Sequence, residues 1–147
     1  MIEYKTMDIT TVTSGIIAHG VNCQGKMGSG VALAIRNHWP VCYAHYAIAC
    51  KTELHLLGKI VTSHVSQNVF IAHCFTQQRY GYFGKFADER AVKACFESLD
   101  IVAKELGLPI YMPRIGCGLG GLDWHDDVEP LLSVFSAENR VTVCDWK

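Results

Sequence analysis

The stretch IIAHGVNCQGKMGSGVALAIR, residues 16–36, decides the fold. An apolar run over 16–21 predicts a strand, and a helical pattern begins at Val31 and continues to Arg36. Glycines at 25, 28 and 30 fill the loop between them, where they permit positive φ angles and close approach of a ligand to the backbone. Free N–H groups at a helix start suit a phosphate. On its own, the loop is better explained as a tight turn without a ligand, and it lacks the G-K-[ST] ending of a Walker motif.

A second glycine-rich loop, PRIGCGLGGL at residues 113–122, has the same setting. It follows a short strand expected over 110–112 and precedes a helix expected from about Trp124. Four glycines within six residues are costly in unfolded-chain entropy, so close contact with a ligand explains them better than a turn does. Ligands of open α/β sheets bind at the carboxyl ends of strands. We therefore expect both loops at one sheet edge, holding a diphosphate between them.

The rest of the chain alternates between strand and helix patterns. Strands are expected at 59–63, 69–75 and 141–144, and helices from Pro40 and over 87–106, where Gly107 ends the strongest helical period. We expect antiparallel pieces at the start and in the middle. This order predicts an α/β fold, a three-layer α/β/α domain with a mixed central sheet of about six strands. No linker or repeat interrupts residues 1–147, so we expect a single domain.

Composition narrows the class of protein. The net charge is −1 and 18% of residues are charged, so no basic face indicates nucleic-acid binding by charge alone. No apolar stretch approaches the roughly 18 residues of a membrane span, and the N-terminus lacks a signal-peptide pattern. Seven cysteines without a C-x-x-C pair suit free thiols in a reducing compartment. We expect a cytoplasmic monomer that does not contact membranes.

Both loops resemble a known pair of motifs. Met27-Gly28-Ser29-Gly30-Val31-Ala32, preceded by Asn22, and Met112-Pro113-Arg114-Ile115-Gly116-Cys117-Gly118-Leu119 are similar to the two signature loops of macrodomains. The similarity extends in order from Met7-Asp8-Ile9 to the last strand. It implies a macrodomain fold and binding of ADP-ribose. The branch that the chain resembles includes terminal ADP-ribose protein glycohydrolases, ADP-ribose 1''-phosphate phosphatases and small phage and bacterial macrodomains.

The resemblance also implies which residues bind the ligand. Asp8 would accept a hydrogen bond from the adenine amino group, with the Ile9 N–H on a ring nitrogen, although Met7 replaces the family's usual glycine. Asn22 would contact the distal ribose. A solvated turn aspartate and an asparagine bonded to its own loop are the alternatives. The two loops would hold the phosphates through Met27, Gly28, Ser29, Gly30, Val31, Ile115, Gly116, Cys117, Gly118, Leu119 and Gly120.

The catalytic residues of the glycohydrolase branch are missing. That branch uses a lysine after the middle strand and an aspartate in the second loop, but this chain has Thr76-Gln77-Gln78-Arg79 and Gly120 there. His19 resembles a histidine of the phosphatases and could act as nucleophile or as acid–base. A buried structural histidine is its alternative. Asp123 is the candidate partner acid, and a helix N-cap explains it equally well.

Three further residues, His38, Cys42 and His45, follow a metal-like spacing, but Pro40 interrupts the helix between them, so we expect no metal and no cofactor. The sequence thus predicts a protein that binds ADP-ribose or ADP-ribose 1''-phosphate and hydrolyses ADP-ribose 1''-phosphate or an ADP-ribosyl ester. ADP-ribosylated macromolecules are further candidate partners. The alternative is an ADP-ribose-binding module without catalysis.

Overall fold

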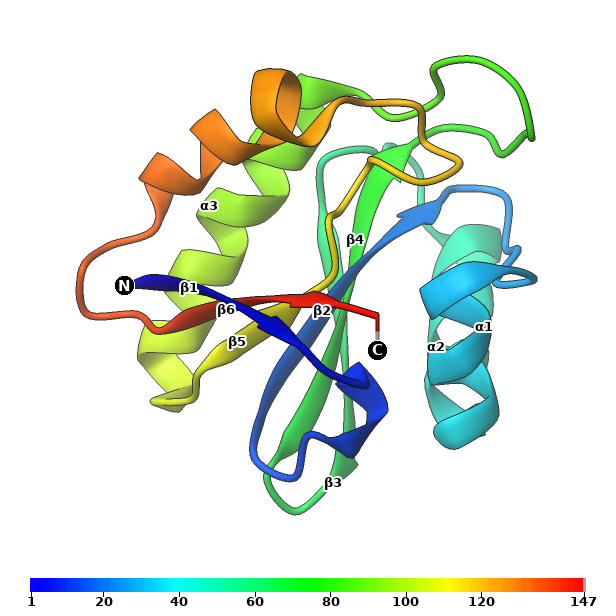
Figure 1. The fold of residues 1–147 in the computed structure, drawn as a ribbon. Helices are drawn as coiled ribbons and strands as arrows, with labels where there is room; N and C mark the ends of the chain where they lie inside the picture. Colours follow the sequence, from blue (N-terminus) through cyan, green and yellow to red (C-terminus); the bar gives the residue numbers. More distant parts are fainter. Residues whose placement is uncertain (147) are drawn as a thin grey trace.

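A computed structural model describes residues 1–146 and shows one six-stranded sheet between two helical layers (Figure 1). The strands occur in the order β1-β6-β5-β2-β4-β3. Their bounds are Ile2–Thr6 (β1), Gly15–Asn22 (β2), Ile60–Ser66 (β3), Val69–Gln77 (β4), Ile110–Met112 (β5) and Val141–Asp145 (β6). The predicted three-layer α/β/α domain with a mixed sheet is confirmed.

Only β3 is antiparallel to its neighbour, β4, so the antiparallel piece expected in the middle of the chain is confirmed. All other pairs are parallel, including β1 with β6, in which Ile2 lies opposite Val141. The expectation of an antiparallel piece at the start of the chain is therefore wrong. The partner of β1 is the last strand of the chain, and a local sequence pattern contains no information on so distant a pairing.

Helices α1 (Gly30–His38) and α2 (Pro40–Thr52) cover one face of the sheet. Pro40 is tolerated because it stands in the first turn of α2, where its missing N–H costs no helical hydrogen bond. Between this layer and the sheet lies a core that includes Ile17, Ile71 and Tyr46. These residues come from β2, β4 and α2, which shows that odd-numbered positions of β2 and β4 face α1 and α2.

The other face is covered by α3 (Glu89–Leu106), a π-helical turn (Trp124–Val128) and a 3-10 helix (Glu129–Val134). Asp88 caps α3 by accepting from the Arg90 N–H at 2.8 Å, and Gly107 ends it at φ 65°. A further 3-10 turn covers Ile9–Thr11. Because β2, β4, β5 and β6 are mutually parallel, their carboxyl ends meet at one edge, where the site lies.

Candidate binding site

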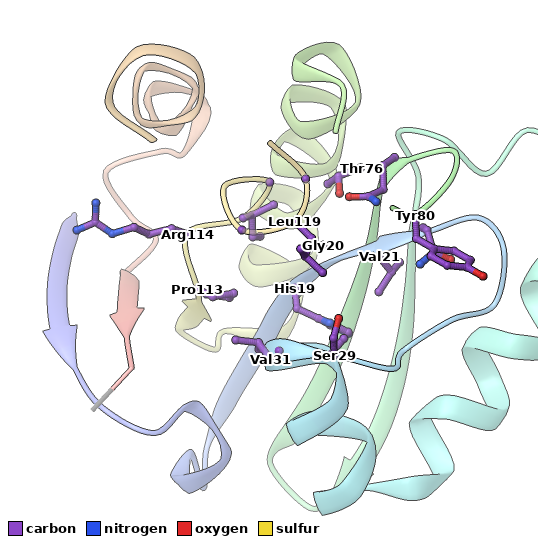
Figure 2. Close-up of a pocket in the computed structure, with 18 of the residues that line it drawn as sticks. His19, Gly20, Val21, Ser29, Val31, Thr76, Tyr80, Pro113, Arg114 and Leu119 are labelled. Atoms are coloured by element: carbon purple, nitrogen blue, oxygen red, sulfur yellow. The ribbon is translucent and has the colours of Figure 1, made fainter. Parts of the chain in front are cut away.

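A cavity of about 690 Å³ opens at that edge, within the size range of small-molecule sites. The two glycine-rich loops form opposite walls, as the sequence predicted. In Figure 2, Ser29 and Val31 of the first loop lie across from Leu119 of the second, with His19 of β2 between them. The lining consists of His19, Gly20, Val21, Asn22, Lys26, Gly28, Ser29, Gly30, Val31, Ala32, Thr76, Gln77, Tyr80, Gly81, Tyr82, Pro113, Arg114, Ile115, Gly116, Gly118, Leu119, Gly120, Cys144, Asp145 and Trp146.

Backbone N–H groups supply most of the donors in these walls. Within residues 1–146, the N–H groups of 28–32 have no partner, and Ser29 caps α1 without a side-chain hydrogen bond. The same holds for the N–H groups of 118–120 in the second loop. Unpaired N–H groups are costly when they are shielded from water, and an anionic ligand satisfies them. The start of α1 adds the positive end of its helix dipole.

Three of the lining glycines leave room for a ligand. A Cβ added at Gly28, Gly30 or Gly118 would meet no atom within 4 Å. Gly120 differs, because its added Cβ would lie 2.6 Å from the Gly116 carbonyl oxygen. The Gly120 carbonyl also accepts hydrogen bonds from Phe86 and Ala87 at 2.8 and 2.9 Å. An aspartate at position 120 is therefore incompatible with this loop conformation.

Asn22 lines the cavity, but most of the hydrogen-bonding capacity of its side chain is used by other groups of the protein. Its Oδ1 accepts from the N–H groups of Gln24 and Lys26, and its Nδ2 donates to the Lys26 carbonyl at 2.9 Å. The Tyr46 hydroxyl lies 2.6 Å from the Asn22 carbonyl oxygen and 2.8 Å from Oδ1. One amide hydrogen remains for a ligand. Asn22 thus shapes the first loop, the role that we named as its alternative, and it still borders the cavity.

His19 is buried at the base of the cavity, with 1% of its surface exposed. Burial lowers the pKa of His19 well below its usual value, with a smaller contribution from the neighbouring His73. The ring is therefore neutral at neutral pH. It acts as an acceptor or base there only if its unprotonated nitrogen faces the ligand.

Other predicted residues lie outside the lining. Asp8 accepts from the Thr10 N–H at 2.9 Å and from its hydroxyl at 2.7 Å, and the two bonds lower the pKa of Asp8. Its neighbour Ile9 is buried in the core. Met27 is also buried, with 1% exposure, and packs beneath the first loop.

Two more predicted residues have structural roles, Cys117 within the second loop and Asp123 directly after it. Cys117 donates its thiol to the Ile115 carbonyl at 3.4 Å, and burial raises the pKa of this thiol to about 11, so it is no nucleophile at neutral pH. Asp123 is exposed and accepts from the Asp126 N–H at 2.8 Å as the cap of the following turn. The structure therefore brings His19 to the cavity, and it does not bring Asp123 beside it.

Several lining residues were missed by the sequence analysis. Lys26 lies between the predicted glycines and is exposed, so its ammonium group can reach an anion at the cavity mouth. Arg114 and Asp145 form a two-point ion pair, at 2.8 and 3.2 Å, next to Trp146. Residues 144–146 lie at the carboxyl end of β6, which meets the same edge. The contribution of these residues to the site can be predicted only if β6 is known to lie beside β5 in the sheet.

No three His, Cys, Asp or Glu side chains among residues 1–146 come together in a way that could hold a metal ion. No helix in this range is long and apolar enough to cross a membrane.

Comparison with known proteins identifies relatives of the whole domain. The Macro domain family model matches residues 18–130. The chain is 30% identical over 139 residues to a DNA ADP-ribosyl glycohydrolase of Mycobacterium tuberculosis, covering 92% of this chain but only 39% of that protein. It is 29% identical over 154 residues to the ADP-ribose 1''-phosphate phosphatase of Lodderomyces elongisporus, covering 95% of this chain and 93% of that protein.

A solved structure agrees with this relationship. The macrodomain of Mycobacterium tuberculosis DarG superimposes with a TM-score of 0.84 at 27% identity, over 99% of this chain and 97% of that one.

Proposed function

This chain belongs to the macrodomain family, and on that premise we propose that it binds ADP-ribose through its two glycine-rich loops and hydrolyses an ADP-ribose derivative. One observation carries the binding proposal. Unpartnered N–H groups at 28–32 and at 118–120 face one cavity from opposite walls. A diphosphate satisfies both sets at once, and the cavity of about 690 Å³ leaves room for groups on either side of it.

The substrate is ADP-ribose 1''-phosphate or an ADP-ribosyl ester. The first class is supported by a relative named ADP-ribose 1''-phosphate phosphatase, and removal of ADP-ribose from a larger molecule is supported by a relative named DNA ADP-ribosyl glycohydrolase. His19 is the candidate acid–base group because it is the lining histidine. Lys26 would approach a phosphate at the mouth of the cavity. If the substrate is an ADP-ribosylated macromolecule, such as a nucleic acid, the ADP-ribose group would enter the cavity and the macromolecule would remain outside it.

Binding without catalysis is the second candidate function, and a specific observation favours it. The loop conformation excludes an aspartate at position 120, and the segment after β4 contains no lysine before Lys85. Lys85 pairs with Glu89 and lies outside the cavity lining. The lysine and the aspartate that the lysine-based reaction requires are therefore absent from the cavity lining, and any hydrolysis must depend on other groups.

Calorimetry followed by a turnover assay tests both candidates. ADP-ribose is titrated into the protein, and phosphate release from ADP-ribose 1''-phosphate and ADP-ribose release from an ADP-ribosylated peptide ester are then followed. Binding with either release supports the enzyme, and binding without release supports the binding module. Absence of binding contradicts the proposal. His19→Ala should abolish release while leaving ADP-ribose bound.

We also propose a cytoplasmic monomer. All seven cysteines are free thiols in the structure, which suits a reducing compartment. Sedimentation analysis at micromolar concentration tests the monomer, and fractionation of the source cells tests the location.

A further inference from the structure

Three exposed aromatic side chains lie at the mouth of the cavity, in a segment between β4 and α3. We call this segment, RYGYFGKF at residues 79–86, the aromatic loop, and it projects from the end of β4 in Figure 1. Tyr80 is 46% exposed, Tyr82 72% and Phe83 94%. Tyr80 and Tyr82 line the cavity, and Phe83 follows them outside the lining. Aromatic side chains gain free energy by burial, so three exposed ones within four residues indicate a contact with another molecule.

The backbone of the aromatic loop is fastened to both walls of the cavity. The Tyr80 N–H donates to Gln24 Oε1 of the first glycine-rich loop at 2.9 Å. At the other end, the N–H groups of Phe86 and Ala87 donate to the Gly120 carbonyl of the second loop at 2.8 and 2.9 Å. A partner that binds between these attachments has less chain to order, and therefore a smaller entropy cost, than one that binds a free loop.

The position of the aromatic loop relates it to one end of the ligand. Gln24, which the Tyr80 N–H contacts, itself donates its N–H to Asn22 Oδ1 at 3.0 Å, and Figure 2 shows Tyr80 near Val21 on this side of the cavity. Asn22 is the residue expected next to the distal ribose, which carries the 1'' position. On the proposed function, a macromolecule attached to that ribose leaves the cavity beside the aromatic loop.

The charges around the aromatic loop favour a polyanion as the attached group. Arg79 is exposed, with its guanidinium carbon 5.7 Å from the centre of the Phe86 ring, and Lys26 is exposed at the cavity mouth. No Asp or Glu occurs between residues 76 and 87. The acidic residues at 123–127 follow the second loop, on the other wall. Proteins that bind single-stranded nucleic acids combine aromatic rings, on which bases stack, with cations along the backbone.

We propose that the aromatic loop is a docking site for a single-stranded nucleic acid that carries the ADP-ribose group. Tyr82 and Phe83 stack on bases next to the modified position, and Arg79 contacts the phosphates. This inference rests on the proposed function and names the macromolecule that remains outside the cavity. Stacking uses the face of the base and not the 2'-hydroxyl, so DNA and RNA should bind alike.

The affinities of three probes test the choice of macromolecule. The probes are ADP-ribose, an ADP-ribosylated single-stranded DNA of about eight nucleotides, and an ADP-ribosylated peptide of about eight residues, the last two joined by linkages that resist hydrolysis. One stacked base should make the DNA probe bind at least about fivefold more tightly than ADP-ribose. The peptide probe should stay within about twofold of ADP-ribose. Equal affinities of the DNA probe and ADP-ribose, or an equal gain by the peptide probe, would overturn the proposal.

Two substitutions of Phe83 separate stacking from apolar contact. Phe83→Trp keeps an aromatic face and should keep the gain of the DNA probe, whereas Phe83→Leu removes the ring and should lower the affinity for this probe about fivefold. ADP-ribose should bind both variants within about twofold of wild type, because Phe83 lies outside the lining. Ile101→Ala, at a 57% exposed position of α3, is the matched control and should change no affinity. Wild-type affinity of Phe83→Leu for the DNA probe would contradict the docking site.

An unmodified oligonucleotide distinguishes failure of this inference from failure of the proposed function. Single-stranded DNA of about eight nucleotides without ADP-ribose, at millimolar concentration, should shift the backbone amide resonances of 79–86. If it does so and ADP-ribose does not bind, the proposed function fails and the docking site stands. If ADP-ribose binds and the oligonucleotide leaves 79–86 unmoved, the docking site is contradicted and the binding proposal survives.

Discussion

Replacing Gly28 by glutamate should weaken ADP-ribose binding by a factor of about thirty or more without harming the fold. Gly28 lines the cavity, its φ is not in the left-handed region, and a Cβ there would meet no atom within 4 Å. A surface-type substitution of this kind changes stability by about 0.5 kcal/mol or less. The effect on affinity should therefore be separable from any effect on folding.

The expected loss follows from charge. A carboxylate about 4 Å from a phosphate costs about 1 kcal/mol even at the dielectric constant of water, and more in a partly enclosed cavity. Two phosphates thus oppose the new charge by about 2 kcal/mol or more, which corresponds to roughly a thirtyfold loss of affinity. Gly28→Gln has nearly the same size without the charge, so the difference between the two variants isolates the electrostatic part.

Calorimetry of wild type, Gly28→Gln and Gly28→Glu measures this difference, with thermal unfolding as a check on folding. Gln67→Glu, in the turn between β3 and β4 at the opposite end of the strands, adds the same charge away from the cavity and should bind as wild type does. The reasoning is refuted if Gly28→Glu binds ADP-ribose as tightly as Gly28→Gln does, because no phosphate could then lie near the first loop.

Three other perturbations have expected outcomes. Tyr46→Phe removes the hydroxyl bonded to Asn22 and should cost about 1–2 kcal/mol in urea unfolding, with weaker ADP-ribose binding through a looser first loop. His19 and His73 have lowered pKa values in the folded state, so the unfolded chain binds more protons below about pH 6.5. Stability should then fall by up to about 1.4 kcal/mol per pH unit for each histidine as the pH decreases toward 4, and His73→Leu should remove about half of this slope. Gly120→Ala forces a Cβ to within 2.6 Å of a carbonyl oxygen and should cost about 1–3 kcal/mol in thermal unfolding; no loss would show that the second loop adapts.

The sequence predicted the layers and the two loops because both depend on local patterns. Alternation of strand and helix, with glycines placed after Val21 and Met112, is enough to place both loops at one sheet edge. The partner of β1 could not be predicted, since it joins residues near opposite ends of the chain. For the same reason the contribution of Trp146 was missed, because it depends on where β6 lies in the sheet.

The role of single side chains was less predictable than the position of the loops. Asp123 and Asn22 have polar side chains that either a ligand or the backbone can use, and only the hydrogen bonds of the structure show that the backbone uses them. The His19–His73 pair lies outside sequence reasoning altogether. The two residues are 54 positions apart, and only the register of β2 against β4 brings them into contact.

Backbone amide resonances during an ADP-ribose titration test the central claim most directly. The account predicts the largest shifts at 28–32 and 118–120, the two sets of unpartnered N–H groups, with saturation at one equivalent of ligand. Shifts confined to a different surface, such as the shallow hollow formed by Lys104, Gly107 and Arg140, or no shifts at all, would contradict it.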